Sequence, residues 1–325
     1  AIPRGIAVVG DNMWAALKGR DAVTAEWDDS KAEKRGSAEI LAEYHKAAVG
    51  PGKAVARNDG DVDRAFATAA KVIEATFEFP YLAHAALEPL NAVARRVDGV
   101  VEVMAGHQMP GFYQFIVSQV AGVAPEQVRL QVMKTGGGFG RRGVFDADVI
   151  SEAVAIAKAL DWKYPVKVQW TRDNDMKGGR YRPAYVHRMK AGLDAAGNIV
   201  AWQNHIVGQS IAAGTALEEM MVHGGIDPTS VEGAANVPYK VANVKVELTT
   251  MSAGIPVLFW RSVGSTHTAY AVEAFLDEVA EAAGKDPVEF RLGLLADHPR
   301  HAAVLKLAAE KAGWGSALPA GRFRG

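Results

Sequence analysis

The stretch of this sequence that points most directly to chemistry is the glycine-rich segment from Thr135 to Gly143. Four of the five residues at 136–140 are glycines, which let backbone amides come close to a ligand in conformations that a Cβ disfavours. The segment lies between a predicted strand and a predicted helix that starts near Val144. A helix N-terminus and the side chains of Arg141 and Arg142 favour an anion such as a phosphate group. The simpler alternative is a flexible turn, although a turn needs fewer glycines.

Two kinds of nucleotide loop compete for this segment. A Walker-type phosphate loop requires a lysine followed by serine or threonine, which the sequence lacks here, so this interpretation fails. The letters from Gly138 to Gly143 do match the dinucleotide pattern G-x-G-x-x-G. That pattern also expects an acidic residue at the end of the next strand, about 20 residues on, whereas Asp173 and Asp175 lie about 30 residues beyond. An NAD(P)-dependent oxidoreductase therefore stays an alternative with weak support.

Two further segments carry side chains suited to holding a ligand. Phe259, Trp260 and Arg261 precede a predicted helix, and an aromatic pair beside an arginine forms a flat slot with one positive edge. The ordinary alternative is a packed strand end with an exposed arginine. Gln108 follows a predicted strand, and its carboxamide offers two donors and an acceptor, which suits an oxo or hydroxo group. A solvated turn is the ordinary alternative here.

Other motifs give less support to a catalytic or metal site. His84 and Glu88 would be an i, i+4 metal pair on a helix, but no third ligand stands at a supporting spacing, which favours an ordinary polar pair. His298 and His301 lie in a polar stretch and are expected at the surface. The sequence has no Gly-x-Ser-x-Gly motif, so a serine hydrolase has no support.

The composition excludes several classes of protein. The 325 residues are 49% apolar and 22% charged, which excludes a disordered or fibrous chain. The net charge of −1 removes the electrostatic argument for nucleic acid or an anionic membrane as the main partner. The absence of cysteine excludes disulfides, cysteine-bound zinc, a thiol nucleophile and any iron–sulfur cluster held by this chain. No apolar run is long enough to predict a membrane-spanning helix.

The wider pattern predicts an α+β protein of mixed sheets and packed helices, without internal repeats. A turn at Asp98-Gly99 predicts a hairpin, and Asp286 and Pro287 predict the start of a helix. Helices are expected at 11–19, 37–49, 112–120, 145–160 and 269–284, and strands at 21–27, 72–79, 92–97, 100–104, 128–133, 166–170, 186–193 and 199–207.

Taken in order, these segments resemble the molybdopterin-binding large subunit of the xanthine dehydrogenase and aldehyde oxidase family. The branch that they resemble most is the isoquinoline 1-oxidoreductase beta subunit, which includes membrane-associated aldehyde dehydrogenases. The resemblance extends over nearly the whole chain and is carried by LAHAALEPLNA at 82–92, AGHQ at 105–108, GGGFGRR at 136–142, RYRP at 180–183, FWRSVG at 259–264, EAFLDEVA at 273–280 and DPVEFR at 286–291.

The resemblance implies a molybdenum–pterin cofactor, either molybdopterin or its cytosine dinucleotide. It implies oxidation of an aldehyde or an N-heteroaromatic carbon with water as the oxygen source. In this sequence Ser262 stands where the family often has glycine after the arginine. The substrate contacts of the family therefore do not carry over directly to this chain. The residues that the resemblance places at the cofactor are Gln108, Gly137, Gly138, Phe139, Gly140, Arg141 and Arg261, and Trp260 is placed at the substrate.

The resemblance also implies an internal fragment of a longer subunit. Residues 1–60 would be the tail of a preceding small α/β domain, and residues 61–325 the first half of the cofactor cradle. The general-base glutamate is expected outside this chain, so the catalytic residues stay unknown and the isolated chain is expected to be inactive. Since the chain has no cysteine, [2Fe–2S] clusters are expected on a small partner subunit, with a cytochrome c as one candidate electron acceptor.

Two expectations remain open at this point. The branch suggests a periplasmic or membrane-associated location, with the cytoplasm as the alternative. A non-catalytic scaffold fragment that no longer binds cofactor is the alternative to an enzyme.

Overall fold

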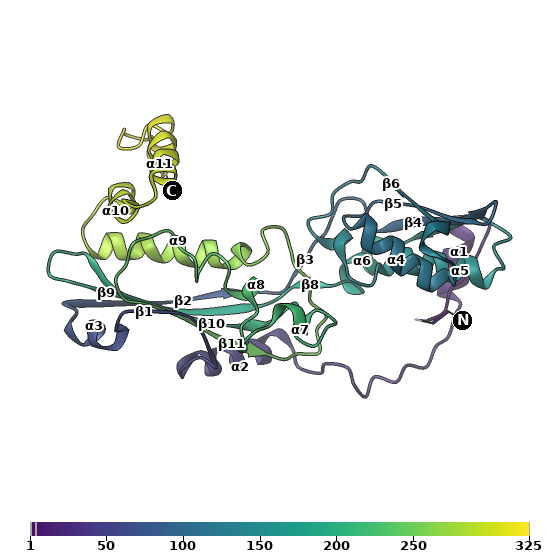
Figure 1. The fold of residues 1–325 in the computed structure, drawn as a ribbon, viewed down its shortest axis with the longest axis horizontal. Coiled ribbons are helices and arrows are strands. Elements are labelled where there is room, and N and C mark those ends of the chain that lie inside the picture. The colour runs from purple at the N-terminus through teal and green to yellow at the C-terminus, as the bar shows by residue number, and fades with distance from the viewer. Residues whose placement is uncertain (1, 4, 325) are drawn as a thin grey trace. The chain divides into compact units, whose positions relative to one another are not determined.

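A computed structural model describes residues 2–3 and 5–324 of the chain, which fold into two compact units (Figure 1). The first unit combines the N-terminal stretch up to Lys34 with Tyr81–Pro183 and Gly254–Arg261. The second combines Arg35–Pro80, Ala184–Ala253 and the stretch from Ser262 onward. Each unit thus draws on both predicted domains, 1–60 and 61–325, and that division stays a prediction.

A four-stranded mixed sheet forms the centre of the first unit, in the order β6-β5-β4-β7. β4 pairs with β5 and β7 in antiparallel fashion, whereas β5 and β6 are parallel. The predicted hairpin turn is confirmed, with Asp98 and Gly99 both in the left-handed region at φ 48° and 81°. The strands are β4 (Asn91–Val97), β5 (Val100–Ala105), β6 (Val128–Val132) and β7 (Val166–Gln169), and a two-stranded sheet pairs β3 (Leu82–Ala83) with β8 (Tyr181–Arg182).

Two helices cover this sheet and close its core. α4 and α5 bury Val117 and Ala153 against Ala92, Val101 and Val103 of the central hairpin. The helices of the unit are α1 (Met13–Asp21), α4 (Pro110–Ala121), α5 (Asp148–Ala159) and α6 (Arg172–Lys177), with 3-10 turns at η1 (Pro125–Gln127) and η2 (Arg141–Gly143).

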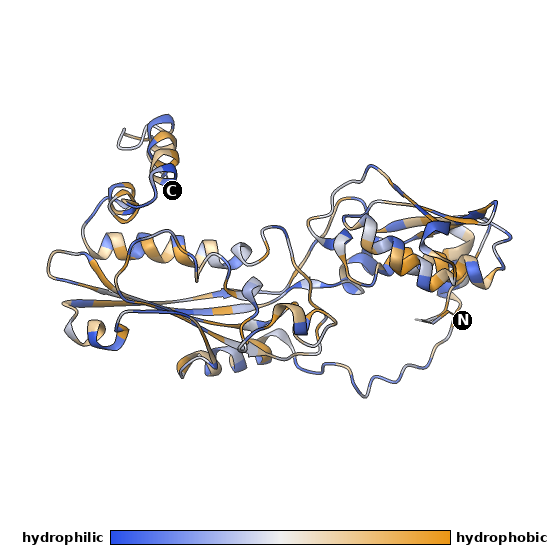
Figure 2. Ribbon diagram, in the orientation of Figure 1, coloured by the Kyte–Doolittle hydropathy of each residue, from blue (hydrophilic) through white to orange (hydrophobic). Residues whose placement is uncertain are grey.

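A five-stranded sheet forms the second unit, in the order β1-β11-β10-β9-β2. α9 lies along one face of this sheet, and α2 and α3 lie on the opposite face (Figure 1). Hydrophobic and hydrophilic residues alternate along α9, as in an amphipathic helix (Figure 2). The helix buries Phe275 and Leu276 against the sheet. The strands are β1 (Ala54–Asp59), β2 (Lys71–Phe79), β9 (Tyr185–Leu193), β10 (Ile199–Gln209) and β11 (Val244–Met251), and the helices are α2 (Ser37–Val49), α3 (Val62–Thr68), α7 (Glu218–Met221), α8 (Pro228–Val231), α9 (Ser265–Ala282), α10 (Pro287–Leu294) and α11 (Pro299–Lys311).

The α+β class is confirmed, and most predicted elements are found within a few residues of their expected ends. Two predictions are wrong. Residues 21–27 form no strand, because this stretch has no pairing partner and its Trp27 is 76% exposed. The helix after the glycine-rich segment begins at Asp148 and not near Val144, because Ala147 adopts a left-handed conformation at φ 48°. In the described part of the chain, no helix is long and apolar enough to cross a membrane.

A buried pair of histidines joins the sheet of the second unit to α9. The ring atom Nε2 of His187 lies 2.8 Å from Nδ1 of His267, and its Nδ1 lies 3.2 Å from Oδ1 of Asn204. Oδ1 of Asn204 is an acceptor, so Nδ1 of neutral His187 carries the proton and donates to it. Nε2 of His187 then accepts from Nδ1 of His267. Burial lowers the pKa of His187 from 6.5 to about 3, so this ring stays neutral in the folded protein.

This burial predicts a specific loss of stability in acid. Below pH 6.5 the unfolded chain binds a proton at His187 that the folded chain refuses until about pH 3, so stability falls as the pH falls between these values. We expect a contribution of up to about 1.4 kcal/mol per pH unit to the free energy of unfolding. Urea denaturation from pH 7 to pH 4 should show a flatter profile for His187→Phe than for the wild type. His301→Phe, at an exposed histidine of α11, should keep the wild-type slope; equal slopes for all three proteins would contradict the prediction.

Candidate cofactor-binding site

The glycine-rich segment forms a loop in the first unit, which we call the glycine loop (Thr135–Gly143). Gly137 and Gly140 have φ values of 102° and 105°, a region that favours glycine. A Cβ on Gly140 would also lie 2.6 Å from the carbonyl oxygen of Phe259. Between these glycines Phe139 adopts φ 55°, an uncommon conformation for a residue with a side chain. The loop therefore needs glycine at 137 and 140 because of its backbone shape and its close contacts.

The carbonyl groups of the glycine loop all have partners within the protein. The five carbonyls from residue 136 to residue 140 accept hydrogen bonds, at 2.8 to 3.2 Å, from the backbone amides of Glu88, Arg141, Arg261 and Gly143 and from Nε of Arg142. In contrast, the amides of residues 137–140 have no acceptor among the described residues. The loop thus has four consecutive N–H groups that no acceptor of the described structure pairs with. Unpaired amides of this kind are the groups with which a backbone concavity binds oxygen atoms or anions.

Gln108 lies against this loop, as the resemblance implies. Its backbone amide donates to the carbonyl oxygen of Arg142 at 3.0 Å. A Cβ on Gly138 would come within 3.2 Å of Oε1 of Gln108, so the carboxamide stands directly beside Gly138. The side chain is exposed and has no hydrogen-bond partner among the described residues. Its donors and acceptor are therefore available to a ligand at the free amides.

Arg261 lies on the other side of Phe139. Its backbone amide donates to the carbonyl oxygen of Phe139 at 2.9 Å. The guanidinium group lies 5.5 Å from the centroid of the Phe139 ring and 5.6 Å from that of Trp260. These two rings are stacked, with centroids 6.1 Å apart and planes at 16°. In the described structure no carboxylate pairs with Arg261, so an unpaired positive charge stands beside the loop.

A small sheet brings the distant motifs to this loop. Leu82 and Ala83 of β3 pair with Arg182 and Tyr181 of β8. The amide of Leu258 in turn donates to the carbonyl of Tyr181 at 2.8 Å, which fixes the start of the aromatic segment. Motifs that lie almost 180 residues apart in the sequence are therefore assembled within the first unit.

The two arginines of the loop are turned into the protein. Arg141 is 3% exposed and its Nη2 lies 2.6 Å from Asp148, while Arg142 is 4% exposed and its Nη2 lies 3.1 Å from Glu88. Burial lowers the pKa of Arg142, and the charge of Glu88 opposes this effect. Both guanidinium charges are thus matched by protein carboxylates. The expected contact of Arg141 with a cofactor stays a prediction.

The structure also removes two alternatives that the sequence left open. His84 and Glu88 do not share a helix, and no group of three or more His, Cys, Asp or Glu side chains in the described residues could hold a metal ion. Nε2 of His84 lies 3.0 Å from the carbonyl oxygen of Phe259, so this histidine supports the aromatic segment. A dinucleotide loop requires a helix that begins directly after it. The glycine loop ends instead in the 3-10 turn η2.

Sequence reasoning considered Glu88 only as a metal ligand and missed its contacts with the loop. Its carboxylate accepts from the amide of Gly136 at 2.7 Å and from Nδ2 of Asn91 at 2.8 Å. These hydrogen bonds lower the pKa of Glu88, with that from Gly136 as the larger cause. The signal that was available is its place in the Leu-Glu-Pro letters of the motif at 82–92.

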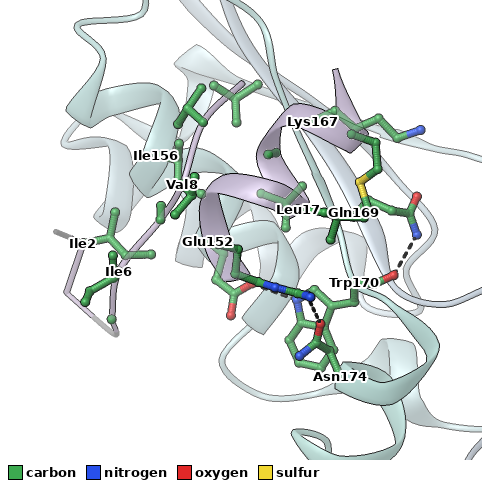
Figure 3. A pocket seen from close by; sticks show the side chains of 18 of the residues that line it. Ile2, Ile6, Val8, Leu17, Glu152, Ile156, Lys167, Gln169, Trp170 and Asn174 are labelled. Atoms are coloured by element: carbon green, nitrogen blue, oxygen red, sulfur yellow. Dashed lines mark hydrogen bonds between the residues drawn. The ribbon is translucent and has the colours of Figure 1, made fainter. Parts of the chain in front are cut away.

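A separate cavity of about 1310 Å³ lies in the same unit, between the N-terminal segment and the elements α5 and β7 (Figure 3). Ile6, Val8 and Ile156 contribute apolar side chains to its wall. Some of its polar groups pair within the protein, for example Nε1 of Trp170, which donates to Glu152 at 2.9 Å. Gln108, Arg261 and the free amides of the glycine loop do not line this cavity, so it is distinct from the site described above.

Comparison with known proteins identifies the kind of domain. Residues 46–293 match the family model of the molybdopterin cofactor-binding domain. The chain is 28% identical to the isoquinoline 1-oxidoreductase subunit beta of Brevundimonas diminuta, over 97% of this chain and 41% of the relative. It is 30% identical to a membrane-bound aldehyde dehydrogenase [pyrroloquinoline-quinone] of Gluconacetobacter polyoxogenes, over 97% of this chain and 43% of the relative. The chain thus spans about two fifths of the length of these relatives.

Solved structures with the same fold agree with this assignment. Quinoline 2-oxidoreductase from Pseudomonas putida 86 matches 93% of this chain and 40% of its own with a TM-score of 0.72 at 19% identity. CO dehydrogenase from Oligotropha carboxidovorans matches 93% of this chain and 41% of its own with a TM-score of 0.66 at 16% identity. The family model covers most of the chain, and the resemblance carried by its motifs is confirmed: this chain belongs to the molybdopterin cofactor-binding domain family.

Proposed function

We propose that this chain forms one half of the cofactor cradle in the large subunit of a molybdenum hydroxylase. The whole subunit would oxidise an aldehyde or an N-heteroaromatic carbon with water as the source of oxygen. The observation that carries this proposal is the run of four unpaired amides at residues 137–140, placed between Gln108 and Arg261. Because the chain spans about two fifths of its relatives, the activity is proposed for the whole subunit.

The residues of the site fit a cofactor rich in oxygen atoms. The free amides of the glycine loop would donate to oxygen ligands, and the carboxamide of Gln108 would donate to an oxo group beside Gly138. Arg261 would supply positive charge that no carboxylate of the described structure neutralises. When bound, the molybdenum–pterin group supplies the two-electron redox chemistry, and the protein supplies binding, orientation and electrostatics.

Phe139 and Trp260 are proposed to form the face on which a planar substrate lies. Phe139 is 38% exposed and Trp260 is half-buried, and their rings are nearly parallel. Stacking of a heteroaromatic substrate on such a ring contributes roughly 0.5–1.5 kcal/mol beyond the area that it buries. A small aliphatic aldehyde gains little from this contact, so the face would favour aromatic substrates.

Electron transfer is proposed to require other chains. The sequence contains no cysteine, so [2Fe–2S] clusters would be held outside these 325 residues. We place them on a small partner subunit, with a cytochrome c as a candidate acceptor. The relative from Brevundimonas diminuta is itself named as a subunit, which supports this arrangement. A periplasmic or membrane-associated location is proposed on the resemblance to that branch alone.

Substitution of a loop glycine should abolish cofactor binding. In the full-length subunit, Gly138→Val would push a branched side chain against Gln108 and across the free amides. We expect at least a tenfold loss of molybdenum per folded protein, measured by metal analysis, with an unchanged circular dichroism spectrum. Gly293→Val, at an exposed glycine of α10 where a Cβ would meet open space, should keep the metal. Full metal loading of Gly138→Val would show that the loop is only a turn.

Removal of the tryptophan face should discriminate between substrates. Trp260→Ala in the full-length enzyme should lower kcat/KM for bulky aromatic substrates about tenfold, near 1.4 kcal/mol, because it removes the stacking surface. The value for acetaldehyde should change much less. Steady-state kinetics with both substrates and a thermal unfolding curve test this expectation. A uniform loss for both substrates together with a large drop in Tm would instead place Trp260 in the core, where its loss costs about 3–5 kcal/mol.

A further inference from the structure

We propose that Glu88 and Arg142 are positioning residues that act as a clamp on the glycine loop and keep its amides turned toward the cofactor. This inference rests on the function proposed above, since it names the residues that give the cofactor site its shape. Neither side chain would need to touch the cofactor itself. Both act on the first two glycines of the loop.

Glu88 forms hydrogen bonds with both polar backbone groups of Gly136, the carbonyl and the amide. The backbone amide of Glu88 donates to the carbonyl oxygen of Gly136 at 3.2 Å, and its carboxylate accepts from the amide of Gly136 at 2.7 Å. The second carboxylate oxygen accepts from Nδ2 of Asn91, the first residue of β4. One carboxylate therefore connects the start of the loop to the central sheet of the unit.

Arg142 completes the clamp from inside. Its Nε donates to the carbonyl oxygen of Gly137 at 2.8 Å. Its Nη2 lies 3.1 Å from the carboxylate of Glu88 and 3.2 Å from the carbonyl oxygen of the same residue. With the carbonyls of Gly136 and Gly137 held inside in this way, the amides that follow are left without a partner. Through Nε and Nη2 the buried guanidinium is thus a fixed part of the loop.

The contact distances explain why residue 136 is a glycine although its φ is not in the left-handed region. A Cβ at this position would lie 2.7 Å from the Cβ of Glu88. Real Cβ atoms do not approach each other so closely. Glu88 can therefore pack against residue 136 only because a glycine, which has no Cβ, stands there. Charge supports the same pairing, because the carboxylate of Glu88, with a smaller contribution from Asp175, offsets the buried charge of Arg142.

Glu102 offers a matched control within the same unit. Its carboxylate, on β5, pairs with Arg95 of β4 and Arg129 of β6, each at 2.7 Å, whereas that of Glu88 pairs with Arg142. Both carboxylates thus pair with arginine, but that of Glu88 also accepts from the backbone of the glycine loop.

Four forms of the full-length subunit test the clamp: the wild type, Glu88→Ala, Glu88→Gln and Glu102→Ala. Hydrogen–deuterium exchange of the peptide that covers residues 134–145, with a peptide of α5 as reference, reports the order of the loop. Metal analysis reports molybdenum per folded protein. We expect Glu88→Ala to speed exchange of the loop at least fivefold and to lower molybdenum at least fivefold, with no change in the α5 peptide. Glu88→Gln should restore part of both, because its amide oxygen can still accept from Gly136.

The outcomes separate the clamp from general stability and from the proposed function. Wild-type loop exchange and metal content in Glu88→Ala would overturn the clamp, as would equal losses in Glu102→Ala. If Glu88→Ala fails to fold, the comparison of Glu88→Gln with Glu102→Gln decides the question by the same two measurements. If the wild type itself binds no molybdenum, the proposed function fails, and loop exchange alone then decides whether the clamp exists.

Discussion

The orientation of five successive peptide groups is the constraint on which the rest of the first unit depends. From residue 136 to residue 140 each carbonyl is bonded within the protein, and the amides of residues 137–140 are left unpaired. An unpaired buried amide costs about 1–3 kcal/mol, so the loop is tolerable only where it stays accessible to water or a ligand. Residues 135–140 of the loop are accordingly half-buried or exposed, while Arg141, Arg142 and Gly143, which follow them, are buried.

The surrounding elements follow from the need to hold these carbonyls. The donors come from three separate parts of the chain: Glu88 after β3, the turn η2 with Arg141, Arg142 and Gly143, and Arg261 at the end of the aromatic segment. Pairing of β3 with β8, and of Tyr181 with Leu258, brings the first and last of these together. The unit is therefore discontinuous in sequence because its central loop needs donors that no single stretch of chain supplies.

Sequence patterns predicted the parts whose cause is local. The capped helix at Asp286 and the hairpin at Asp98-Gly99 follow from residue types at fixed spacing, and both are confirmed. The strand at 21–27 could not be excluded, because alternation says nothing about whether a partner strand exists. In the site, the glycines and Gln108 were identified by motif. The pairing of Arg142 with Glu88 was not, because a long-range ion pair leaves no periodic signal in a single sequence.

The proposed use of main-chain groups for a cofactor has a consequence for how such a domain can diversify. Only proline removes a backbone N–H on substitution, so a site made of amides chiefly limits the residues that shape the chain, such as Gly136 and Gly140. The ring of Phe139 and the indole of Trp260 project from the same short segments but make no backbone contact that the loop requires. Under the proposed function, changes of substrate would accumulate in these two rings while the contacts made by the amides stay fixed, which separates the evolution of specificity from that of redox chemistry.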